Sequence, residues 1–391
     1  MTKIKDVRTT IWQWVGPVRP LPANSCTTPS DLVTDPGGNL GSFSFLGWLI
    51  VEIECADGTL GIGNAALAVQ ASKVVIDSYL KPLLIGQDPL DSEYLWQSMY
   101  RRTMAFGRRG IGMTAISAVD LAIWDLKGKL IGQPVFRLLG GRTKPTVPVY
   151  VSKLYGQPLS ELASEAAAYL KQGFRMMKLR LGWGPRHGRE GMCRNLELVR
   201  TVRETVGDSV EIMADAYMGW DLEYAKRMLP KLARYDLRWL EEPLPPDDVA
   251  GYAQLKAMGH VPISGGEHES SLAGFRQLIE ARAIDFAQFD TNRVGGVTVA
   301  HKITTMCEAQ NISVVPHAGQ MHNYHVVMAS YGAPFAEYFP HGPVEVGNEL
   351  FWYIFEGEPT ARDGFIELRE DLPGFGLTLK EPHPAEFRLV R

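Results

Sequence analysis

The sequence predicts an α/β protein in which parallel strands and helices alternate to form a TIM barrel, with a separate α+β domain before it. Three observations lead to this fold. Short apolar runs alternate with helical stretches over residues 131–338, the pattern of a parallel barrel with helices outside. Antiparallel strand signals precede them. Asp215, Glu241 and Glu267 each close an apolar run, 26 residues apart both times, which is about one strand and one helix per step.

Residues 1–130 are predicted to form the α+β domain. Strand patterns cover residues 3–14, 47–55 and 59–64. Asp57-Gly58 marks a hairpin turn between the last two strands. Helical periodicity follows from about residue 68 to 130 and is clearest in the amphipathic stretch SAVDLAIWDLKGKL. Residues 17–41, rich in Pro, Gly, Ser and Thr, form either a disordered excursion or a mobile lid, and their length favours a functional role.

The barrel is predicted from eight strand-like runs, at residues 147–151, 174–180, 210–214, 238–241, 262–264, 284–289, 312–316 and 335–338. Stretches between them, such as LSELASEAAAYLKQ and GGVTVAHKITTMCEAQ, have helical periodicity. Residues 339–391 return to irregular Pro- and Gly-rich segments without a helical pattern. We expect this tail to pack back on the first domain.

Composition excludes several classes of protein. With 391 residues, 45% of them hydrophobic, the chain is long enough for two domains. A net charge of -4 gives no basic field, so neither nucleic acid nor an anionic membrane is an expected partner. The four cysteines are scattered singly, which fits neither a disulfide framework nor a zinc cluster. No secretory signal or membrane-spanning apolar run is found, and we expect a cytoplasmic protein.

Charged side chains end seven consecutive predicted strands. In chain order they are Lys178 and Arg180, Asp215, Glu241, Glu267, Asp290, His317 and Glu337. A single carboxylate at a strand end is usually a helix cap or a surface group, but capping does not explain seven in a row. Because substrates bind at the C-terminal face of such barrels, these residues predict an active site there.

Three of these carboxylates, Asp215, Glu241 and Glu267, follow consecutive strands and are expected to converge. Converging carboxylates repel one another unless a cation lies between them. Oxygen ligands suit a hard divalent ion, so the sequence predicts Mg²⁺, with coordination positions left open for oxygens of a substrate. A metal-assisted enzyme is the resulting hypothesis.

The remaining strand-end residues predict acid-base chemistry. His317 in VVPHAGQ has Asp290 one strand earlier, and a carboxylate bonded to one imidazole nitrogen raises the basicity of the other, as a general base requires. Lys178 and Arg180 project from the same side of their strand and suit an anionic substrate. Arg180 stays protonated and can only orient the substrate. His268 either reaches the substrate or fixes its loop.

Together these residues resemble the enolase superfamily, in its mandelate racemase branch, over nearly the whole chain. The resemblance implies a modified (β/α)7β barrel under an N-terminal capping domain that the C-terminal segment completes. It also implies specific roles: Mg²⁺ ligands at Asp215, Glu241 and Glu267, a His-Asp dyad at His317 and Asp290, and the family's last-strand acidic residue at Glu337. In this family the metal binds a substrate carboxylate, a base removes the α-proton, and the metal stabilises the enediolate.

Within that branch, acid-sugar dehydratases of the L-rhamnonate dehydratase type are most similar, in the segments KLRLGWGPRHG, WLEEPLPPDDVAGYAQLK, SGGEHESS and VVPHAGQMHNYH. This similarity implies loss of the C2 proton and the C3 hydroxyl from an aldonate, giving a 2-keto-3-deoxy acid. Racemases of the branch carry Lys-x-Lys where this chain has Lys178-Leu179-Arg180. One-base syn elimination through His317 is therefore favoured.

The nearest alternative is a racemase, epimerase or diacid-sugar dehydratase of the galactarate type, with Lys178 as a second base. A metal-dependent aldolase and a barrel that binds sugar acids without turnover are more distant alternatives. The expected partner is a small acid sugar, with L-rhamnonate, L-lyxonate, L-mannonate and D-gulonate as candidates. Because such families usually assemble, a homo-oligomer is expected.

Overall fold

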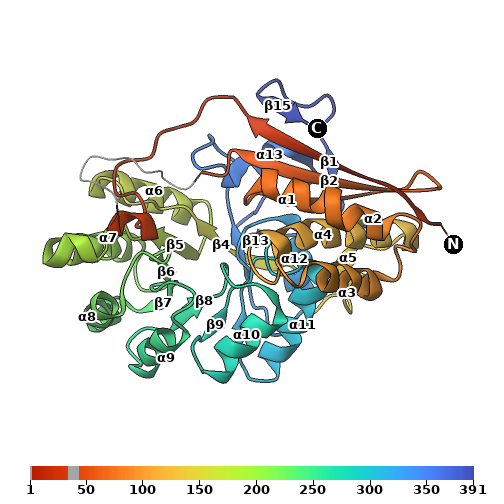
Figure 1. Ribbon diagram of the computed structural model, residues 1–391. Coiled ribbons are helices and arrows are strands. Elements are labelled where there is room, and N and C mark those ends of the chain that lie inside the picture. Colours follow the sequence, from red (N-terminus) through yellow and green to blue (C-terminus); the bar gives the residue numbers. More distant parts are fainter. Residues whose placement is uncertain (1, 34–43) are drawn as a thin grey trace.

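The computed structural model describes residues 2–33 and 44–391. A cap formed by the first part of the chain lies against a curled parallel sheet with helices outside it (Figure 1). Both ends of the chain lie on the side of the cap. Residues 34–41 of the predicted lid lie outside the described residues.

The cap contains a four-stranded antiparallel sheet in the order β15-β1-β2-β3. Its strands are β1 (Ile4–Trp14), β2 (Gly47–Cys55), β3 (Leu60–Ala65) and β15 (Phe387–Val390). The first three confirm the predicted strands to within one residue. The fourth comes from the C-terminal tail and pairs with β1, so the tail packs back on the cap as expected.

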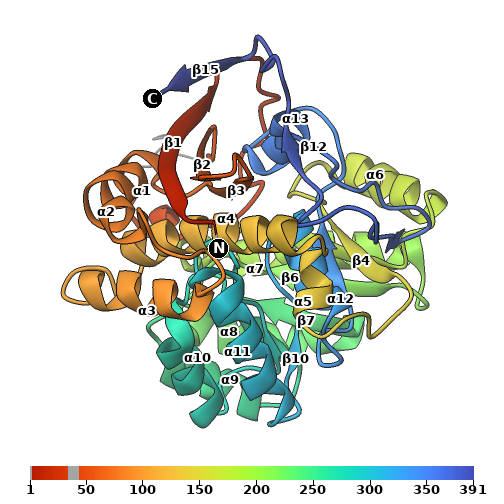
Figure 2. The same ribbon diagram turned by 90° about the vertical axis from the view of Figure 1, so that its right-hand side faces the viewer.

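A long buried helix joins the cap to the barrel. The helical segments of the cap are α1 (Val69–Val75), η2 (Ile76–Leu80), α2 (Lys81–Leu84), α3 (Ser92–Thr103) and α4 (Ile111–Ile131). We predict an amphipathic helix over residues 117–130, but this stretch is buried on every side as far as Leu126, and every residue from Gly112 to Leu126 is buried. The helix packs against β3 on one side and against barrel helix α11 (Gly296–Glu308) on another (Figure 2). A helix enclosed in this way buries every face, and its polar side chains are buried with hydrogen-bond partners, as for Asp120 with Thr298.

Gly63 lets β3 contact α4 through the backbone. A Cβ at this position would lie 2.1 Å from the carbonyl oxygen of Ala118 and 2.6 Å from the amide nitrogen of Ala122. We expect Gly63→Ala to lower the free energy of unfolding by about 3 kcal/mol, because strand and helix must separate. Urea denaturation measures this change. Gly342, which has open space around its Cβ position, is the control, and an equal loss in Gly342→Ala would contradict the explanation.

Eight strands alternate with seven main helices between residues 147 and 338, a stretch that the structure describes completely. The strands are β4 (Val147–Ser152), β5 (Met176–Arg180), β6 (Glu211–Asp215), β7 (Leu237–Glu241), β8 (Ile263–Gly265), β9 (Phe286–Ala287), β10 (Ser313–Val314) and β11 (Ala336–Tyr338). They confirm all eight predicted runs. Their order is β10-β9-β8-β7-β6-β5-β4-β11, so each strand from β4 to β10 lies beside its neighbour along the chain, and the last strand, β11, pairs in parallel with the first, β4.

The helices of the barrel lie outside this sheet (Figure 1). Besides α11, they are α6 (Leu159–Lys171), α7 (Gly188–Val206), α8 (Leu222–Leu232), α9 (Val249–Ala257), α10 (Ser271–Glu280) and α12 (Met321–Met328). Single turns occur at η1 (Pro29–Leu32), η3 (Pro185–His187), η4 (Ala233–Tyr235) and α5 (Val135–Leu138). The inside of the barrel is filled by its own apolar cluster of Tyr150, Met213, Trp239, Phe286, Val315 and Phe335. This cluster forms the floor beneath the strand ends.

The C-terminal tail contacts both parts of the molecule. It contains η5 (Asn348–Leu350), α13 (Phe351–Ile354), β12 (Phe355–Glu356), β13 (Phe365–Ile366) and β14 (Thr378–Leu379). Strand β13 pairs with β4 of the barrel, and β12 pairs with β14. We expected no helix here, and η5 and α13 correct that prediction, because single turns are too short to show periodicity. Among the described helices, none combines the length and apolarity needed to cross a membrane.

Candidate active site

Three strand-end residues lie next to one another at the C-terminal edge of the barrel sheet. In the parallel register, Arg180 of β5 is opposite Asp215 of β6, which is opposite Glu241 of β7. Glu267 follows β8 by two residues. All four are buried, so the predicted convergence of these charged residues at one end of the barrel is what the structure shows.

Backbone conformations at this end are strained. Several non-glycine residues that follow barrel strands have left-handed φ angles, among them Leu154 at 48°, Tyr217 at 41°, Met218 at 59°, Glu242 at 35° and Ala318 at 72°. Such conformations cost free energy and persist only where the surrounding structure holds them, typically around functional sites. The strained backbone therefore lies at the same end of the barrel as the converging charged side chains.

Lys178 is enclosed by carboxylates. Its Nζ lies 2.5 Å from Glu241 Oε1, 2.9 Å from Glu337 Oε1 and 3.8 Å from Asp215 Oδ2. Burial disfavours the ammonium, but attraction to Glu241 and Glu337 outweighs it and raises the pKa of Lys178 well above its usual value. Arg180 pairs with the same Asp215 oxygen at 2.5 Å. Both cations are therefore held protonated at the mouth of the barrel.

Glu241 rests on the floor of the barrel. Its Oε2 accepts hydrogen bonds from Trp239 Nε1 and Gln288 Nε2, each at 2.9 Å. Burial raises the pKa of Glu241 to about 7. The attraction of Lys178 opposes this rise, and repulsion from nearby carboxylates, first from Asp215, adds to it. A cation among these groups would remove that repulsion.

The donor set fits a hard divalent ion. Asp215, Glu241 and Glu267 offer only carboxylate oxygens, the ligand type that Mg²⁺ prefers, and all three are shielded from water. Within the described residues, however, the group whose possible ligand atoms all lie within 4.8 Å of one another is Glu242, Glu267 and His268. The structure does not bring the three expected ligands equally close, because Asp215 and Glu241 pair with the neighbouring cations instead.

His317 and Asp290 form the predicted pair. Asp290 and His317 lie opposite each other in a parallel bridge, and His317 Nδ1 lies 2.9 Å from Asp290 Oδ2. The other ring nitrogen, Nε2, lies 3.0 Å from Glu267 Oε2. Burial disfavours the imidazolium, but Glu267 and Asp290 outweigh this and raise the pKa of His317 to about 10. Attraction to Glu267 therefore favours the charged imidazolium, and an ion bound by Glu267 would offset that attraction and favour the neutral ring.

Glu337 connects the segment that carries His317 to Lys178. Its Oε2 accepts a hydrogen bond of 2.8 Å from the amide of Ala318, the residue after His317. Its other oxygen contacts Lys178. Burial opposes its ionisation, but the attraction of Lys178 outweighs this and lowers the pKa of Glu337. Glu337 thus stays anionic and holds both neighbours in place.

Sequence reasoning missed Arg293. Its Nε lies 3.0 Å from Asp290 Oδ2, the oxygen that also bonds His317, and its Nη1 lies 3.6 Å from Glu267 Oε1. Burial raises the pKa of Asp290, but Arg293 outweighs it, so the net shift is downward. The one signal in the sequence is its position three residues after Asp290, from which a side chain can return to the strand end.

The structure also adds Glu242 to the site. His268 Nδ1 lies 2.6 Å from Glu242 Oε2 and 3.4 Å from Glu267 Oε1. Burial disfavours the imidazolium, but Glu242 outweighs this and raises the pKa of His268. His268 therefore fixes the loop through Glu242 and lies at the mouth. His322 and His325, expected to be structural, are buried in α12.

The described part of residues 17–41 lies on the barrel loops. The amide of Thr27 donates to the carbonyl of Leu181, and the amide of Gly156 donates to the carbonyl of Ser25, each at 2.7 Å. Nearer the cap, Arg19 pairs with the buried carboxylate of Glu345. The segment thus spans from the cap to the barrel mouth, the placement that a lid requires.

Comparison with known families agrees with this architecture. Residues 40–140 match the mandelate racemase/muconate lactonizing enzyme N-terminal domain, and residues 161–383 match the enolase C-terminal domain-like family. The chain belongs to the mandelate racemase branch of the enolase superfamily. This confirms the family, the fold class and the enzymatic nature predicted from the sequence.

Three relatives place the chain more closely. It is 38% identical to an L-rhamnonate dehydratase from Saccharopolyspora erythraea, over 85% of this chain and 83% of the relative. The crystal structure of L-rhamnonate dehydratase from Gibberella zeae superposes with a TM-score of 0.85 and 33% identity, covering 99% of this chain and 96% of that one. A rhamnonate dehydratase structure from Gibberella zeae complexed with Mg gives a TM-score of 0.84 and 31% identity, covering 99% and 96%.

Proposed function

We propose that this enolase-superfamily enzyme is an Mg²⁺-dependent acid-sugar dehydratase of the L-rhamnonate dehydratase type. It removes the C2 proton and the C3 hydroxyl of an aldonate to give a 2-keto-3-deoxy acid. The similarity to named L-rhamnonate dehydratases supports the substrate class. The relative complexed with Mg supports the choice of ion. Cytoplasmic location, homo-oligomeric assembly, and the lack of nucleic-acid or membrane partners belong to the same proposal.

The observation that carries the proposal is the enclosure of Lys178. Two carboxylates, Glu241 and Glu337, lie within 2.9 Å of its Nζ, so the amine is engaged with them rather than directed at a substrate carbon. Arg180 is always charged. An ion held by Glu267 would weaken the contact between that carboxylate and Nε2 of His317, and would leave His317, oriented by Asp290, as the base. A single base favours elimination over racemisation, which requires bases on opposite faces of the α-carbon.

Each predicted residue has a role in this reaction. Asp215, Glu241 and Glu267 would hold the ion. When bound, Mg²⁺ supplies positive charge beside the substrate carboxylate, which makes the C2 proton more acidic. Lys178 and Arg180 add positive charge for the same anionic group, and His268 contributes to substrate binding. Asp290 fixes the His317 tautomer, and Glu337 holds Lys178 in place.

His317 carries out both proton transfers. Its Nε2 accepts the C2 proton, and the electron pair of the broken C–H bond moves toward the carboxylate. The imidazolium then donates that proton to the C3 hydroxyl, which leaves as water while a C2–C3 double bond forms. The resulting enol tautomerises to the 2-keto-3-deoxy acid. Because one residue serves both groups, the proposed elimination is syn.

Incubation with a library of acid sugars and Mg²⁺ tests this function. We expect one or more aldonates to lose one water, detected by mass spectrometry. In D₂O, we expect the product to carry deuterium at C3, and recovered substrate to keep its C2 configuration. Recovery of the deuterated C2 epimer would instead indicate the two-base alternative with Lys178. Absence of dehydration across the library would contradict the proposal.

A further inference from the structure

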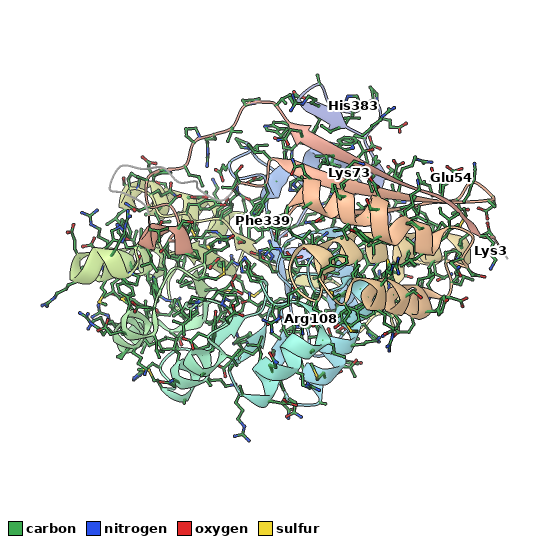
Figure 3. The ribbon with its side chains drawn as sticks, viewed as in Figure 1. Lys3, Glu54, Lys73, Arg108, Phe339 and His383 are labelled. Atoms are coloured by element: carbon green, nitrogen blue, oxygen red, sulfur yellow. The ribbon has the colours of Figure 1, made fainter. Side chains whose placement is uncertain are left out.

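A small cavity lies between the cap and the mouth of the barrel, beside the dyad. Its volume is about 30 Å³, which exceeds the minimum that one water-sized group needs. Phe339, which lines it, is labelled near the centre of Figure 3. His317, Asn292 and Gln320 also line it. The cavity therefore has room for one hydroxyl group next to the proposed base.

Asn292 presents an acceptor whose orientation is fixed by its neighbour. Its Nδ2 donates to the backbone oxygen of Asn64 on β3 at 2.6 Å and to the side-chain oxygen of the same residue at 2.9 Å. A backbone carbonyl only accepts, so the NH₂ group of Asn292 must be on that side. Asn292 is 6% exposed, and its Oδ1 has no hydrogen-bond partner among the described residues.

The side-chain amide of Gln320 also lines the cavity. Gln320 lies three residues after His317 and precedes α12, but its side chain makes no capping hydrogen bond to that helix. Gln320 is 6% exposed, and across residues 2–33 and 44–391 its Oε1 meets no hydrogen-bond donor. Buried polar atoms without partners are rare in folded proteins and indicate that a donor is supplied from elsewhere.

We propose that Asn292 and Gln320 form a subsite that accepts a hydrogen bond from one hydroxyl of the acid sugar, beyond the two carbons that react. This inference rests on the proposed function and adds the residues that select among acid sugars. A hydroxyl suits the subsite because it brings the donor that the amide oxygens need and fits the cavity volume. A carboxylate has no proton to donate at neutral pH.

A site that bonds a substrate hydroxyl rejects an analogue without it, because the buried acceptors are then left unpaired. We expect the wild-type enzyme to prefer the hydroxyl-bearing acid sugar over the matching deoxy analogue by about 10²-fold in kcat/KM. The analogues to compare each lack a single hydroxyl beyond C3. One of them should show this preference, and the others should not.

Gln320→Leu removes one acceptor while keeping a side chain of similar size. We expect this variant to reduce the preference at least about tenfold, mainly by lowering kcat/KM for the hydroxyl-bearing substrate. Asn292→Ala is the second variant, and it should reduce the preference for the same analogue. Thr114→Val is the matched control, because Thr114 lines the same cavity but its hydroxyl already donates to Gly110. It should leave the preference unchanged.

If Gln320→Leu and Asn292→Ala lowered kcat/KM equally for the hydroxyl-bearing acid sugar and its deoxy analogue, the proposed subsite would be wrong. The two oxygens would then bind an ordered water. That result leaves the proposed function standing, since the wild-type enzyme would still dehydrate acid sugars. If the wild-type enzyme dehydrated no acid sugar, both the proposed function and the subsite would be wrong.

Discussion

Replacing His317 by Asn is expected to lower kcat by at least about 10³-fold while leaving the fold intact, within the range known for loss of a general base. Asn has nearly the same shape around its first atoms and can still bond Asp290, but it cannot take the C2 proton. We expect no replacement by Lys178, because its Nζ is held by Glu241 and Glu337. Exchange of the C2 proton with D₂O should disappear together with dehydration.

The control for this variant is His322→Asn. His322 is also buried, but burial lowers its pKa to about 4, so it stays neutral at the working pH and takes no part in the proposed reaction. A folded His322→Asn enzyme should keep its turnover. If His317→Asn turned over as fast as the wild type with unchanged circular dichroism, His317 would be removed from the mechanism.

Removal of divalent metal is expected to abolish turnover, and adding Mg²⁺ back should restore it. Mg²⁺ should also stabilise the fold, because an ion among Asp215, Glu241 and Glu267 offsets their mutual repulsion. Ligand binding at about 100 times Kd adds about 2.7 kcal/mol to the free energy of unfolding. The rise in melting temperature with Mg²⁺ measures this effect without relying on activity.

A pair of adjacent variants locates the ion. Glu241→Gln removes an expected ligand, whereas Glu242→Gln removes a member of the compact group with Glu267 and His268. We expect Glu241→Gln to lose the Mg²⁺-dependent rise in melting temperature and Glu242→Gln to keep it. The reverse result would move the ion to the Glu242 group and contradict the predicted ligands.

The alternation of strands and helices in the barrel could be predicted from the sequence, because each element has its own short pattern of apolar and polar residues. Apolar runs that end in a charged residue predicted the bounds of β6 and β7 to within one residue. The same charged residues were predicted to lie at the mouth of the barrel. The amphipathic prediction for α4 failed for a nonlocal reason. The helix is covered by β3 and α11, which are distant in sequence, so its polar residues as far as Asp125 are buried too.

The partners of the strand-end charges could not be predicted. Glu241 and Glu242 are adjacent, yet one bonds Lys178 inside the barrel and the other bonds His268 at the mouth. The left-handed φ of Glu242, which separates these directions, depends on the packing of the whole loop. Arg293 was missed for a similar reason, because its contacts with Asp290 and Glu267 join two different strand ends.

The sequence by itself determined the architecture, the family and the kinds of side chain at the end of the barrel, since these follow from periodicity and from position along each strand. Only the tertiary structure decided which cation neutralises which carboxylate and that Lys178 is enclosed. It also placed two amide oxygens beside His317, because the cap and the barrel meet there. Hydrogen bonds and ion pairs act over a few ångströms, so their partners are set by where distant segments come together in space.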